Sequence, residues 1–405
     1  MSDVMAGVRV VEVAAWTFVP AAGAVLADWG ADVIKIEHPE TGDPQRGLVV
    51  GNVGAKDSRG INFLVEQPNR GKRSLALDIA SEQGRELLLK LIGTADVFLT
   101  NLLADSLARL RLTVEDVRAA NPNIIYARGT GQGIRGPDAQ RGGFDSASYW
   151  SRGGIAAALT EPAAPWPPLQ RPAFGDIMGG LTIAAGIAAA LFKRERTGEP
   201  AVTDVSLLST ATWNLAPDVV AAGLLGSAGI PRFDVDDMPN PLTNYYRTSD
   251  GRYLNLVMLQ SDRFWPEFAT LVGRPDLIDD PRFKTAADRF THRRACITEI
   301  RSIFSARPLA EWRETLSGLE GVWAAVQTAG ELHQDPQVVE NGYLRPVEAD
   351  DGSTFSLVAS PIQFDETPPD LRRAPEHGQH TEEICLELGL GWEEIIALKE
   401  AGALL

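Results

Sequence analysis

The stretch RPAFGDIMGG, residues 171–180, places a single carboxylate, Asp176, among glycines at the start of an alanine-rich run. An aspartate in front of a helix accepts backbone N–H groups and stabilises the helix by about 0.5–2 kcal/mol. The same N–H groups would keep the carboxylate ionised, and Gly175, Gly179 and Gly180 would leave space for a substrate. A nucleophilic carboxylate needs both conditions. Asp176 is therefore either a helix cap or the nucleophile of a covalent reaction.

Other sequence patterns for catalysis or cofactor binding are incomplete. GQGIRG at 131–136 matches the glycine spacing of a dinucleotide-binding loop, but PDAQRGG follows in place of a helix, so we interpret it as a turn or a loop close to a ligand. The sequence has no G-x-S-x-G elbow and no G-x-x-x-x-G-K-[ST] loop. Of the five histidines only His377 and His380 lie close together, so we expect no metal site and no tightly bound cofactor.

Charge and cysteine content restrict the partners and the compartment. The formal net charge of −16 argues against binding to nucleic acid or to an anionic membrane, because both need a basic surface. Cys296 and Cys385 match no metal or redox spacing, which favours reduced thiols in a cytoplasmic protein. The start of the chain lacks the pattern of a signal peptide. The apolar run 177–192 is shorter than a membrane span and predicts a buried core helix.

Short β-branched runs alternate with helical patterns in the first part of the chain. Leucines and alanines at helical spacing separate the runs, and Ser81 is placed to cap a helix that ends near Gly93. Repeated strand–helix–strand units imply right-handed crossovers and a mostly parallel, Rossmann-like sheet with ligands at the carboxyl ends of its strands. The expected strands are 8–14, 31–38, 73–79, 95–101 and 123–131.

At 405 residues the chain has room for two domains. Proline and glycine become more frequent from about residue 217, where a loop, a hairpin and a helical stretch follow one another. We predict an α/β fold with a large domain and a smaller α+β domain. Residues 1–216 form the first part of the large domain, 217–330 form the small domain with its linkers, and 331–405 return to the large domain.

Six segments carry a resemblance over nearly the whole chain. They are LADWGADVIKIEHPETGDPQR (26–46), NRGKRSLALDI (69–79), ADVFLTNLLADSLARLRL (95–112), NPNIIYARGTGQG (121–133), FGDIMGG (174–180) and GIAAALFKRERTGE (186–199). In this order they resemble the class III coenzyme A transferases, the superfamily that includes formyl-CoA transferase, carnitine and bile-acid CoA transferases and alpha-methylacyl-CoA racemase. The resemblance implies an interlocked homodimer that acts on acyl-CoA and a carboxylic acid, with CoA as a substrate.

The resemblance also implies roles for individual residues. Asp176 takes the position of the catalytic carboxylate, which attacks an acyl-CoA thioester to form an aspartyl mixed anhydride. Asn101 is placed near the CoA chain and Arg109 near its phosphates. Backbone N–H groups around Gly179 and Gly180 are candidates for stabilising the oxyanion. Further basic candidates for CoA binding are Lys72, Arg73 and Arg46.

Three positions depart from the family pattern. His38 stands where the transferases commonly carry an arginine against the adenine, and FVP at 18–20 stands where many members have AGP. Phe144 replaces the histidine of the racemases, while Asp145 beside it is present. Proton exchange at the alpha carbon needs a base on each face, so we predict a CoA transferase. The alternatives are a 2-methylacyl-CoA racemase or isomerase and a CoA-binding protein without turnover.

Six aromatic residues are candidates for the acyl site: Trp16, Phe18, Phe144, Tyr149, Trp150 and Trp166. A roomy apolar pocket made by them would favour a bulky acyl group over formate or oxalate. The same residues are equally compatible with ordinary packing in the protein core.

Overall fold

The fold is described from a computed structural model, which covers residues 4–50, 53–54, 56–57 and 59–405. The chain forms a large unit of Met1–Gly229 and Pro336–Leu405 and a small unit of Ile230–Asp335. Two separate stretches of sequence therefore build the large unit. The boundaries expected from the sequence fall earlier in the chain. The main difference is α9 (Ala216–Leu225), which belongs to the large unit.

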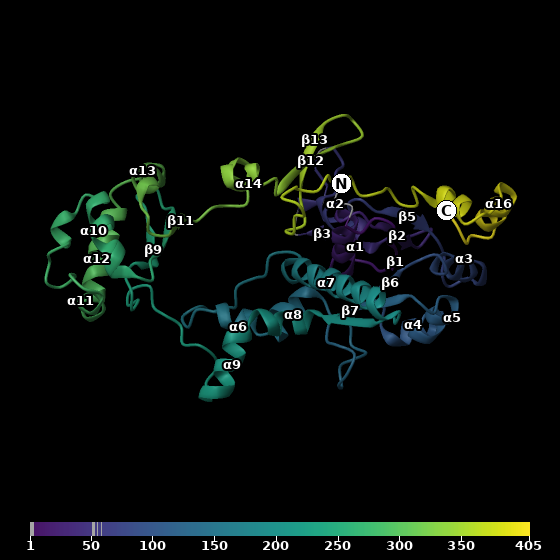
Figure 1. Ribbon diagram of the computed structural model, residues 1–405, viewed down its shortest axis with the longest axis horizontal. Coiled ribbons are helices and arrows are strands. Elements are labelled where there is room, and N and C mark those ends of the chain that lie inside the picture. Colours follow the sequence, from purple (N-terminus) through teal and green to yellow (C-terminus); the bar gives the residue numbers. More distant parts are fainter. Residues whose placement is uncertain (1–3, 51–52, 55, 58) are drawn as a thin grey trace. The chain divides into compact units, whose positions relative to one another are not determined.

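A six-stranded sheet lies at the centre of the large unit (Figure 1). Its order is β5-β2-β1-β6-β7-β8, and all neighbouring strands are parallel, as predicted. The five predicted strands are confirmed. The edge strand β8 is missing from the prediction because most of its VTDVS side chains are partly exposed and form no apolar run. The strands are β1 (Arg9–Val13), β2 (Asp32–Glu37), β5 (Arg73–Ala76), β6 (Val97–Thr100), β7 (Ile125–Thr130) and β8 (Val202–Ser206).

The direction in which the sheet grows reverses next to β1. The chain adds β2 and β5 on one side of β1 and then returns to add β6, β7 and β8 on the other side. This is the order of doubly wound sheets, in which ligands bind outside the carboxyl ends of the strands at the point of reversal. The topology therefore predicts a binding site where the chain leaves β1 and β6.

Helices cover both faces of the sheet, because successive side chains of a strand point to opposite faces. Val10 and Val97 share a core with α1 and α7. Their neighbours Val11 and Phe98 share the opposite core with five other helices. The first layer is α1 (Phe18–Asp28) and α7 (Phe174–Thr197), and the second is α3 (Glu82–Ile92), α4 (Ala104–Leu110), α5 (Val114–Ala120), α15 (Thr381–Glu387) and α16 (Trp392–Glu400). Ser81 caps α3 and Gly93 ends it, as predicted.

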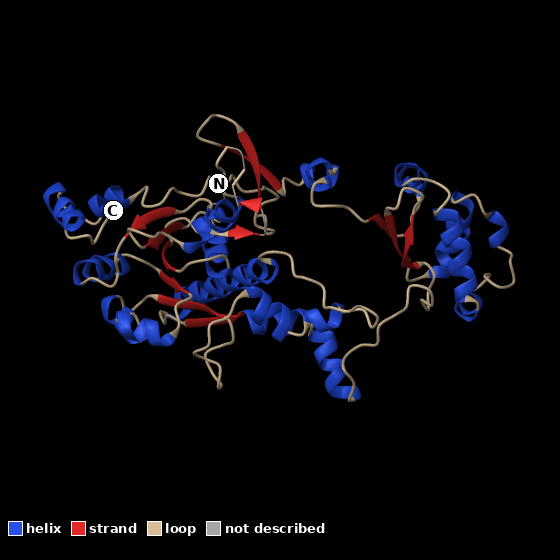
Figure 2. Cartoon of the chain, turned by 180° about the vertical axis from the view of Figure 1, so that it is seen from behind, coloured by secondary structure: helices blue, strands red, loops and turns tan. Residues whose placement is uncertain are grey.

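Shorter elements complete the two units. In the small unit β9 (Thr243–Arg247) and β10 (Tyr253–Val257) form the predicted hairpin, and β11 (Trp323–Ala325) pairs with β10. Figure 2 shows these strands in red and the helices in blue. The large unit also contains η1 (Pro44–Gly47), β3 (Val49–Val50), β4 (Val53–Gly54), α2 (Phe63–Asn69), the π-helix η2 (Ser146–Arg152), α6 (Ile155–Leu159), α8 (Leu207–Asn214), α14 (Pro336–Glu340), β12 (Leu344–Glu348) and β13 (Thr354–Val358). The small unit contains β9 (Thr243–Arg247), β10 (Tyr253–Val257), α10 (Ser261–Leu271), η3 (Pro275–Leu277), α11 (Ala286–Thr291), α12 (Arg293–Phe304), α13 (Leu309–Thr315), η4 (Leu316–Gly318), β11 (Trp323–Ala325) and η5 (Glu331–Gln334).

Helix α7 contains the apolar run 177–192. Within the described part of the chain it is the one helix that is long and apolar enough to cross a membrane, judged by length and composition. Here it buries Ile183, Ala184 and Ile187 in the core that it shares with α1 and the sheet. The apolar character of α7 is therefore explained by burial in the protein core, as predicted.

Two glycines let α7 approach α1 closely. A Cβ atom on Gly180 would lie 2.5 Å from Ala21 Cβ and 3.0 Å from the backbone nitrogen of Ala22. A Cβ atom on Gly179 would lie 2.3 Å from the ring of Phe18. The expectation that these glycines leave space for a substrate is therefore wrong, because the space is filled by α1.

Gly180→Ala should destabilise the protein by about 1–3 kcal/mol, because the added methyl group collides with α1. Gly186→Ala is the matched control in the same helix, since the nearest atom to a Cβ there is 3.9 Å away. The control should gain up to about 1 kcal/mol from better helix propensity. Urea unfolding followed by circular dichroism measures both changes, and equal effects at the two positions would contradict the proposed contact.

Candidate active site

The loops that follow β1 and β6 are held together at the point where the sheet reverses. Asn101, directly after β6, donates from Nδ2 to the carbonyl of Ala15 at 2.7 Å and accepts from the Ala15 N–H at 3.3 Å. Both ends of the Asn101 amide are thus bonded to the loop after β1. Asn101 lies in the region expected for CoA, and it orients this loop.

Trp16, next in the loop, has a left-handed backbone with φ of 68°. A non-glycine residue in this region carries strain of about 1–2 kcal/mol. Its N–H donates to Asp43 Oδ1 at 3.1 Å, and Asp43 Oδ2 forms a buried ion pair with Lys35 at 2.8 Å. The buried carboxylate of Asp43 therefore stabilises the strained turn at Trp16.

Lys72 belongs to the same buried charge cluster. Its ammonium donates to both oxygens of Glu12, at 2.9 and 2.8 Å, and to the carbonyl of Pro20 at 2.8 Å. Its side chain is completely buried, and this burial lowers its pKa to about 8. The interpretation of Lys72 as a phosphate contact is not supported, because its ammonium has no surface to offer to a ligand.

Asp176 is the third residue of α7 and does not cap the helix. The cap position is held by Ala173, whose carbonyl accepts the N–H of Ile177. The carboxylate is half-buried. Burial and then the negative charge of Asp145 raise the pKa of Asp176 to about 7. The pKa of Asp176 thus lies above its ordinary value, in the opposite direction to the one expected from the N–H groups of the helix.

Asp145 is the second carboxylate of the site and is only 8% exposed. One of its oxygens, Oδ2, accepts the N–H of Gly175 at 3.0 Å. A Cβ atom on Gly175 would lie 2.4 Å from Asp145 Oδ1 and 2.3 Å from Tyr149 Cγ, so only glycine lets the carboxylate reach the helix backbone. Burial raises the pKa of Asp145 as well. Two carboxyl groups with raised pKa values, Asp145 and Asp176, thus lie close together at the start of α7.

Two cavities meet at Asp176. The first has a volume of about 320 Å3 and the second of about 580 Å3. Asp176, Trp16 and Phe144 line both of them. The rings of Trp16 and Phe144 stand edge to face, with centroids 5.6 Å apart. This aromatic pair therefore contributes to the walls of both cavities beside the carboxylate.

The two cavities differ in their walls. The first lies at the sheet reversal and is lined by Asn101, Ser106 and several glycines of the 129–143 segment. One of these is Gly131, the first residue of GQGIRG, which is a loop as expected. The second is lined by Leu48, Leu64 and Leu169 on its apolar side and by polar side chains that include Gln45 and Arg171. Both cavities thus combine apolar walls with a small number of polar groups, and the second is the larger of the two.

Arg109 and His38 lie at the surface on the carboxyl side of the sheet. Arg109 is exposed on α4, and its guanidinium lies 3.4 Å from Ser106 Oγ, which belongs to a residue that lines the first cavity. His38 follows β2 and is exposed, with Nδ1 accepting the N–H of Glu40 at 3.2 Å. Both side chains are accessible to a ligand. Arg46 is instead engaged by Glu37, with two bonds of 2.7 Å.

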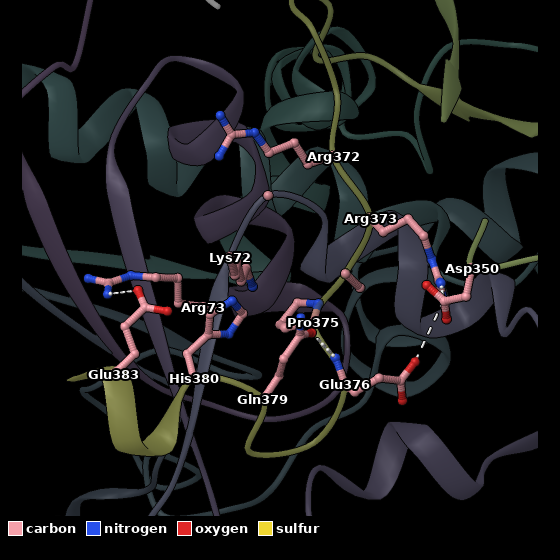
Figure 3. Close-up of a pocket in the computed structure, with 12 residues that line it drawn as sticks. Lys72, Arg73, Asp350, Arg372, Arg373, Pro375, Glu376, Gln379, His380 and Glu383 are labelled. Carbon is pink, nitrogen blue, oxygen red and sulfur yellow. Dashed lines mark hydrogen bonds and ion pairs between the residues drawn. The ribbon is translucent and has the colours of Figure 1, made fainter. Parts of the chain in front are cut away.

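Arg73 lies at the amino end of β5, the opposite end of the sheet from Asn101. Its guanidinium makes two bonds to Asp32, at 2.9 and 2.7 Å, and pairs with Glu383 and Glu387. It lines a separate cavity of about 470 Å3, where Figure 3 shows Arg73 directed at Glu383 and Arg373 directed at Asp350. The expectation that Arg73 contacts CoA is not supported, because carboxylates engage it far from Asp176.

Gly179 and Gly180 cannot supply an oxyanion hole. They are the sixth and seventh residues of α7, beyond the first turn, in which N–H groups lack helical partners. The N–H of Gly175, within that turn, is already bonded to Asp145. The proposed donors are therefore engaged within the protein.

The six aromatic candidates separate into two groups. Trp16, Phe18 and Phe144 line the cavities. Tyr149 is buried and accepts a hydrogen bond from Asn214, Trp150 packs edge to face on Phe174, and Trp166 is 79% exposed. The remaining site residues, among them Ser106, Leu48, Leu64 and Gln170, were missed, because isolated polar and leucine positions carry no sequence signal.

The chain is similar to known proteins over nearly its whole length. CoA-transferase family III matches residues 5–381 of the chain. A cinnamoyl-CoA:phenyllactate CoA-transferase of Clostridium sporogenes is 31% identical, with 98% of this chain and 97% of that protein covered. A (R)-2-hydroxy-4-methylpentanoate CoA-transferase of Clostridioides difficile is 30% identical, with 98% of each covered. The crystal structure of a CAIB/BAIF family protein from Brucella suis has a TM-score of 0.79 and 30% identity, and covers 94% of this chain and 98% of its own.

The chain therefore belongs to CoA-transferase family III. Both clostridial relatives are named as CoA-transferases, and such enzymes act on acyl-CoA thioesters and carboxylic acids. Within the described residues no group of three or more His, Cys, Asp or Glu side chains is arranged to hold a metal ion.

Backbone strain at Trp16 predicts an unusual order of stability. Trp16→Gly should be more stable than Trp16→Ala by about 1 kcal/mol, because glycine adopts a left-handed backbone without strain. Phe192, 69% exposed in the interior of α7, is the control. There the glycine variant should be less stable than the alanine variant by about 1 kcal/mol. Thermal unfolding of the four variants measures both differences, and the same order at both positions would exclude strain at Trp16.

Proposed function

We propose that the protein transfers CoA from an acyl-CoA thioester to a carboxylic acid, with Asp176 as the nucleophile. The observation that carries the proposal is the position of Asp176 where the two cavities meet. The first cavity, beside Asn101 and near Arg109, suits the CoA arm, and the second suits the acyl group. A thioester that extends from one cavity into the other presents its carbonyl carbon to the carboxylate.

The transfer proceeds in steps that each conserve an activated acyl bond. An oxygen of Asp176 attacks the thioester carbon and the C–S bond breaks. CoA leaves as a thiolate, and the acyl group remains on Asp176 as a mixed anhydride. The thiolate then attacks the aspartyl carbonyl carbon, which releases the first acid and leaves an aspartyl thioester. The second acid attacks the aspartyl thioester and displaces the CoA thiolate, which forms a second mixed anhydride. The thiolate then attacks the acyl carbon of this anhydride, which gives the new acyl-CoA and frees Asp176.

We infer that the acyl group is bulky and apolar. The second cavity, at about 580 Å3, has more volume than formate or oxalate requires, and Leu48, Leu64 and Leu169 line it. The names of the two clostridial relatives also refer to acids with an aromatic or branched carbon chain. Phe144 offers no base, which favours transfer over racemisation at the alpha carbon.

We further propose a homodimer. None of the residues of α9 is buried, and Trp213, Val220 and Leu224 of α8 and α9 are 80%, 59% and 81% exposed. An apolar surface of this kind marks a protein interface, and a second copy of the chain would cover it. In sedimentation, Leu224→Glu should shift the protein to monomer, whereas Leu259→Glu, at an exposed position of the small unit, should not. A monomeric wild-type protein would contradict the proposal.

We place the enzyme in the cytoplasm, without a nucleic-acid or membrane partner. Both cysteines are buried free thiols, which suits a reducing compartment. The net charge of −16 does not suit binding to a polyanion.

Trapping of the intermediate tests the proposed function. Incubation with acyl-CoAs of bulky acids and hydroxylamine should convert Asp176 to a hydroxamate, which peptide mass spectrometry locates. Asp176→Ala should give no adduct and lose about 10³-fold or more of the transfer rate. Asp279→Ala, with a side chain 90% exposed in the small unit, should behave as wild type. CoA binding without an adduct from any acyl-CoA would favour the non-catalytic alternative.

The pKa of Asp176 predicts the pH dependence of transfer. Only the ionised carboxylate attacks, so kcat/KM for acyl-CoA should rise with pH and level off above about 7. Asp145→Asn removes a negative charge next to Asp176 and should move the rising part of the pH profile to lower pH. Asp279→Asn should leave it in place. A limb that Asp145→Asn does not move would show that the two carboxylates do not interact.

A further inference from the structure

The wall of the second cavity contains a single basic side chain. Among the described residues that line either cavity, Arg171 is the only one with a cationic side chain. It is exposed, and none of the hydrogen bonds or ion pairs within the described part of the chain involves its guanidinium. Asp145 and Asp176 line the same cavity. An accessible guanidinium therefore shares this cavity with two carboxyl groups and is paired with neither.

Other basic residues of the large unit are engaged by carboxylates of the protein. Arg46 makes two bonds of 2.7 Å to Glu37, and Lys72 is buried against Glu12. A guanidinium offers N–H donors in a planar arrangement that matches the two oxygens of a carboxylate. Because no carboxylate among the described residues engages Arg171, its guanidinium is available to the carboxylate of a ligand.

The position of Arg171 is fixed by the residues on either side of it. Pro172 follows it, and the residue before a proline is restricted to an extended backbone. Gln170 precedes it, and the amide of Gln170 is hydrogen-bonded to the carboxylate of Asp145. Arg171 lies five positions before Asp176, immediately before α7. A short anchored segment thus holds the guanidinium beside the proposed nucleophile.

We propose that Arg171 binds the carboxylate of the acid substrate and positions it for reaction at Asp176. One oxygen of the acid pairs with the guanidinium, and the other attacks the carbonyl carbon of the aspartyl thioester. The new C–O bond forms the mixed anhydride, the C–S bond breaks, and CoA leaves as a thiolate. The donor acid, which is released as a carboxylate, leaves through the same contact. This inference rests on the proposed function, because it assigns to Arg171 a step of the transfer through Asp176.

A cation is needed here because the acid is an anion in an unfavourable electrostatic environment. The formal net charge of the protein is −16, and an ionised Asp176 repels a second carboxylate. The carbonyl group of a thioester carries no charge and needs no such partner. Loss of the guanidinium should therefore weaken the binding of the acid much more than the binding of acyl-CoA.

Calorimetry on the full-length protein saturated with CoA tests the contact without turnover. The probes are 4-methylpentanoate and its neutral amide, 4-methylpentanamide, at a pH of about 6, below the pKa of Asp176. Wild type should bind the carboxylate at least about tenfold more tightly than the amide. Arg171→Gln should reduce this preference to about twofold or less, and Arg171→Lys, which keeps the charge, should fall between the two. Arg196→Gln, at an exposed arginine in the last turn of α7, should keep the full preference.

Steady-state kinetics distinguish a contact with the acid from a general defect of the site. Exchange of deuterated 4-methylpentanoate into 4-methylpentanoyl-CoA gives a KM for each substrate. Arg171→Gln should raise the KM of the acid at least about tenfold and change the KM of the acyl-CoA about twofold or less. A distorted site would change both values, and circular dichroism checks that each variant folds.

Equal affinity of wild type for the carboxylate and the amide, a preference that Arg171→Gln retains, or an equal rise of both KM values would overturn the inference. Failure of wild type to bind either probe would also overturn it, because the second cavity would then not be the site of the acid. The proposed function is judged separately by the hydroxamate at Asp176, which forms without a free acid. An adduct without the carboxylate preference would overturn only the inference, and the preference without an adduct would overturn only the proposed nucleophile.

Discussion

The close approach of α7 to α1 is the constraint on which the site depends. Gly179 and Gly180 lie against Phe18 and Ala21, and any side chain there would push the helices apart. Because α1 follows the loop after β1, this contact brings the start of α7 over the point where the sheet reverses. Asp176 thereby reaches the switch-point crevice that the topology of a doubly wound sheet provides for ligands.

The charged residues near the loop after β1 fall into two groups, one paired and one unpaired. Beneath it, Glu12, Lys35, Asp43 and Lys72 form a buried cluster in which the opposite charges are paired, and this cluster holds the strained turn at Trp16. Among the described residues Asp176 forms no ion pair with a cationic side chain, and its pKa is raised to about 7. The folded state binds this proton more tightly than the unfolded chain, so the group destabilises the fold as pH rises from about 4 to 7. The burial that raises the pKa of Asp176 therefore lowers the free energy of unfolding at neutral pH.

The strands of the sheet could be predicted because each is a local run of apolar residues. The wrong predictions concern residues whose contacts lie far away in the sequence. Strands β1, β2, β5, β6 and β7 are buried β-branched runs that periodicity detects, but β8 is a short edge strand without such a run. Lys72 and Arg73 looked like accessible basic residues because their partners, Glu12 and Asp32, are far away in sequence. The glycines after Asp176 were assigned to a substrate for the same reason, since α1 is their neighbour only in three dimensions. Asp176 was singled out by its position among glycines at the start of an apolar run, and the family resemblance then favoured the role of nucleophile over that of helix cap.

The most direct measurement follows oxygen through the reaction. The acceptor acid is labelled with ¹⁸O in its carboxylate, and the peptide that contains Asp176 is weighed after many turnovers. The attacking oxygen of the acceptor bridges the mixed anhydride, and it stays on Asp176 when the thiolate takes the acyl group. The account therefore predicts ¹⁸O in the Asp176 carboxylate and none at Asp145. Labelled acyl-CoA that accumulates while the oxygens of Asp176 remain unlabelled would contradict it.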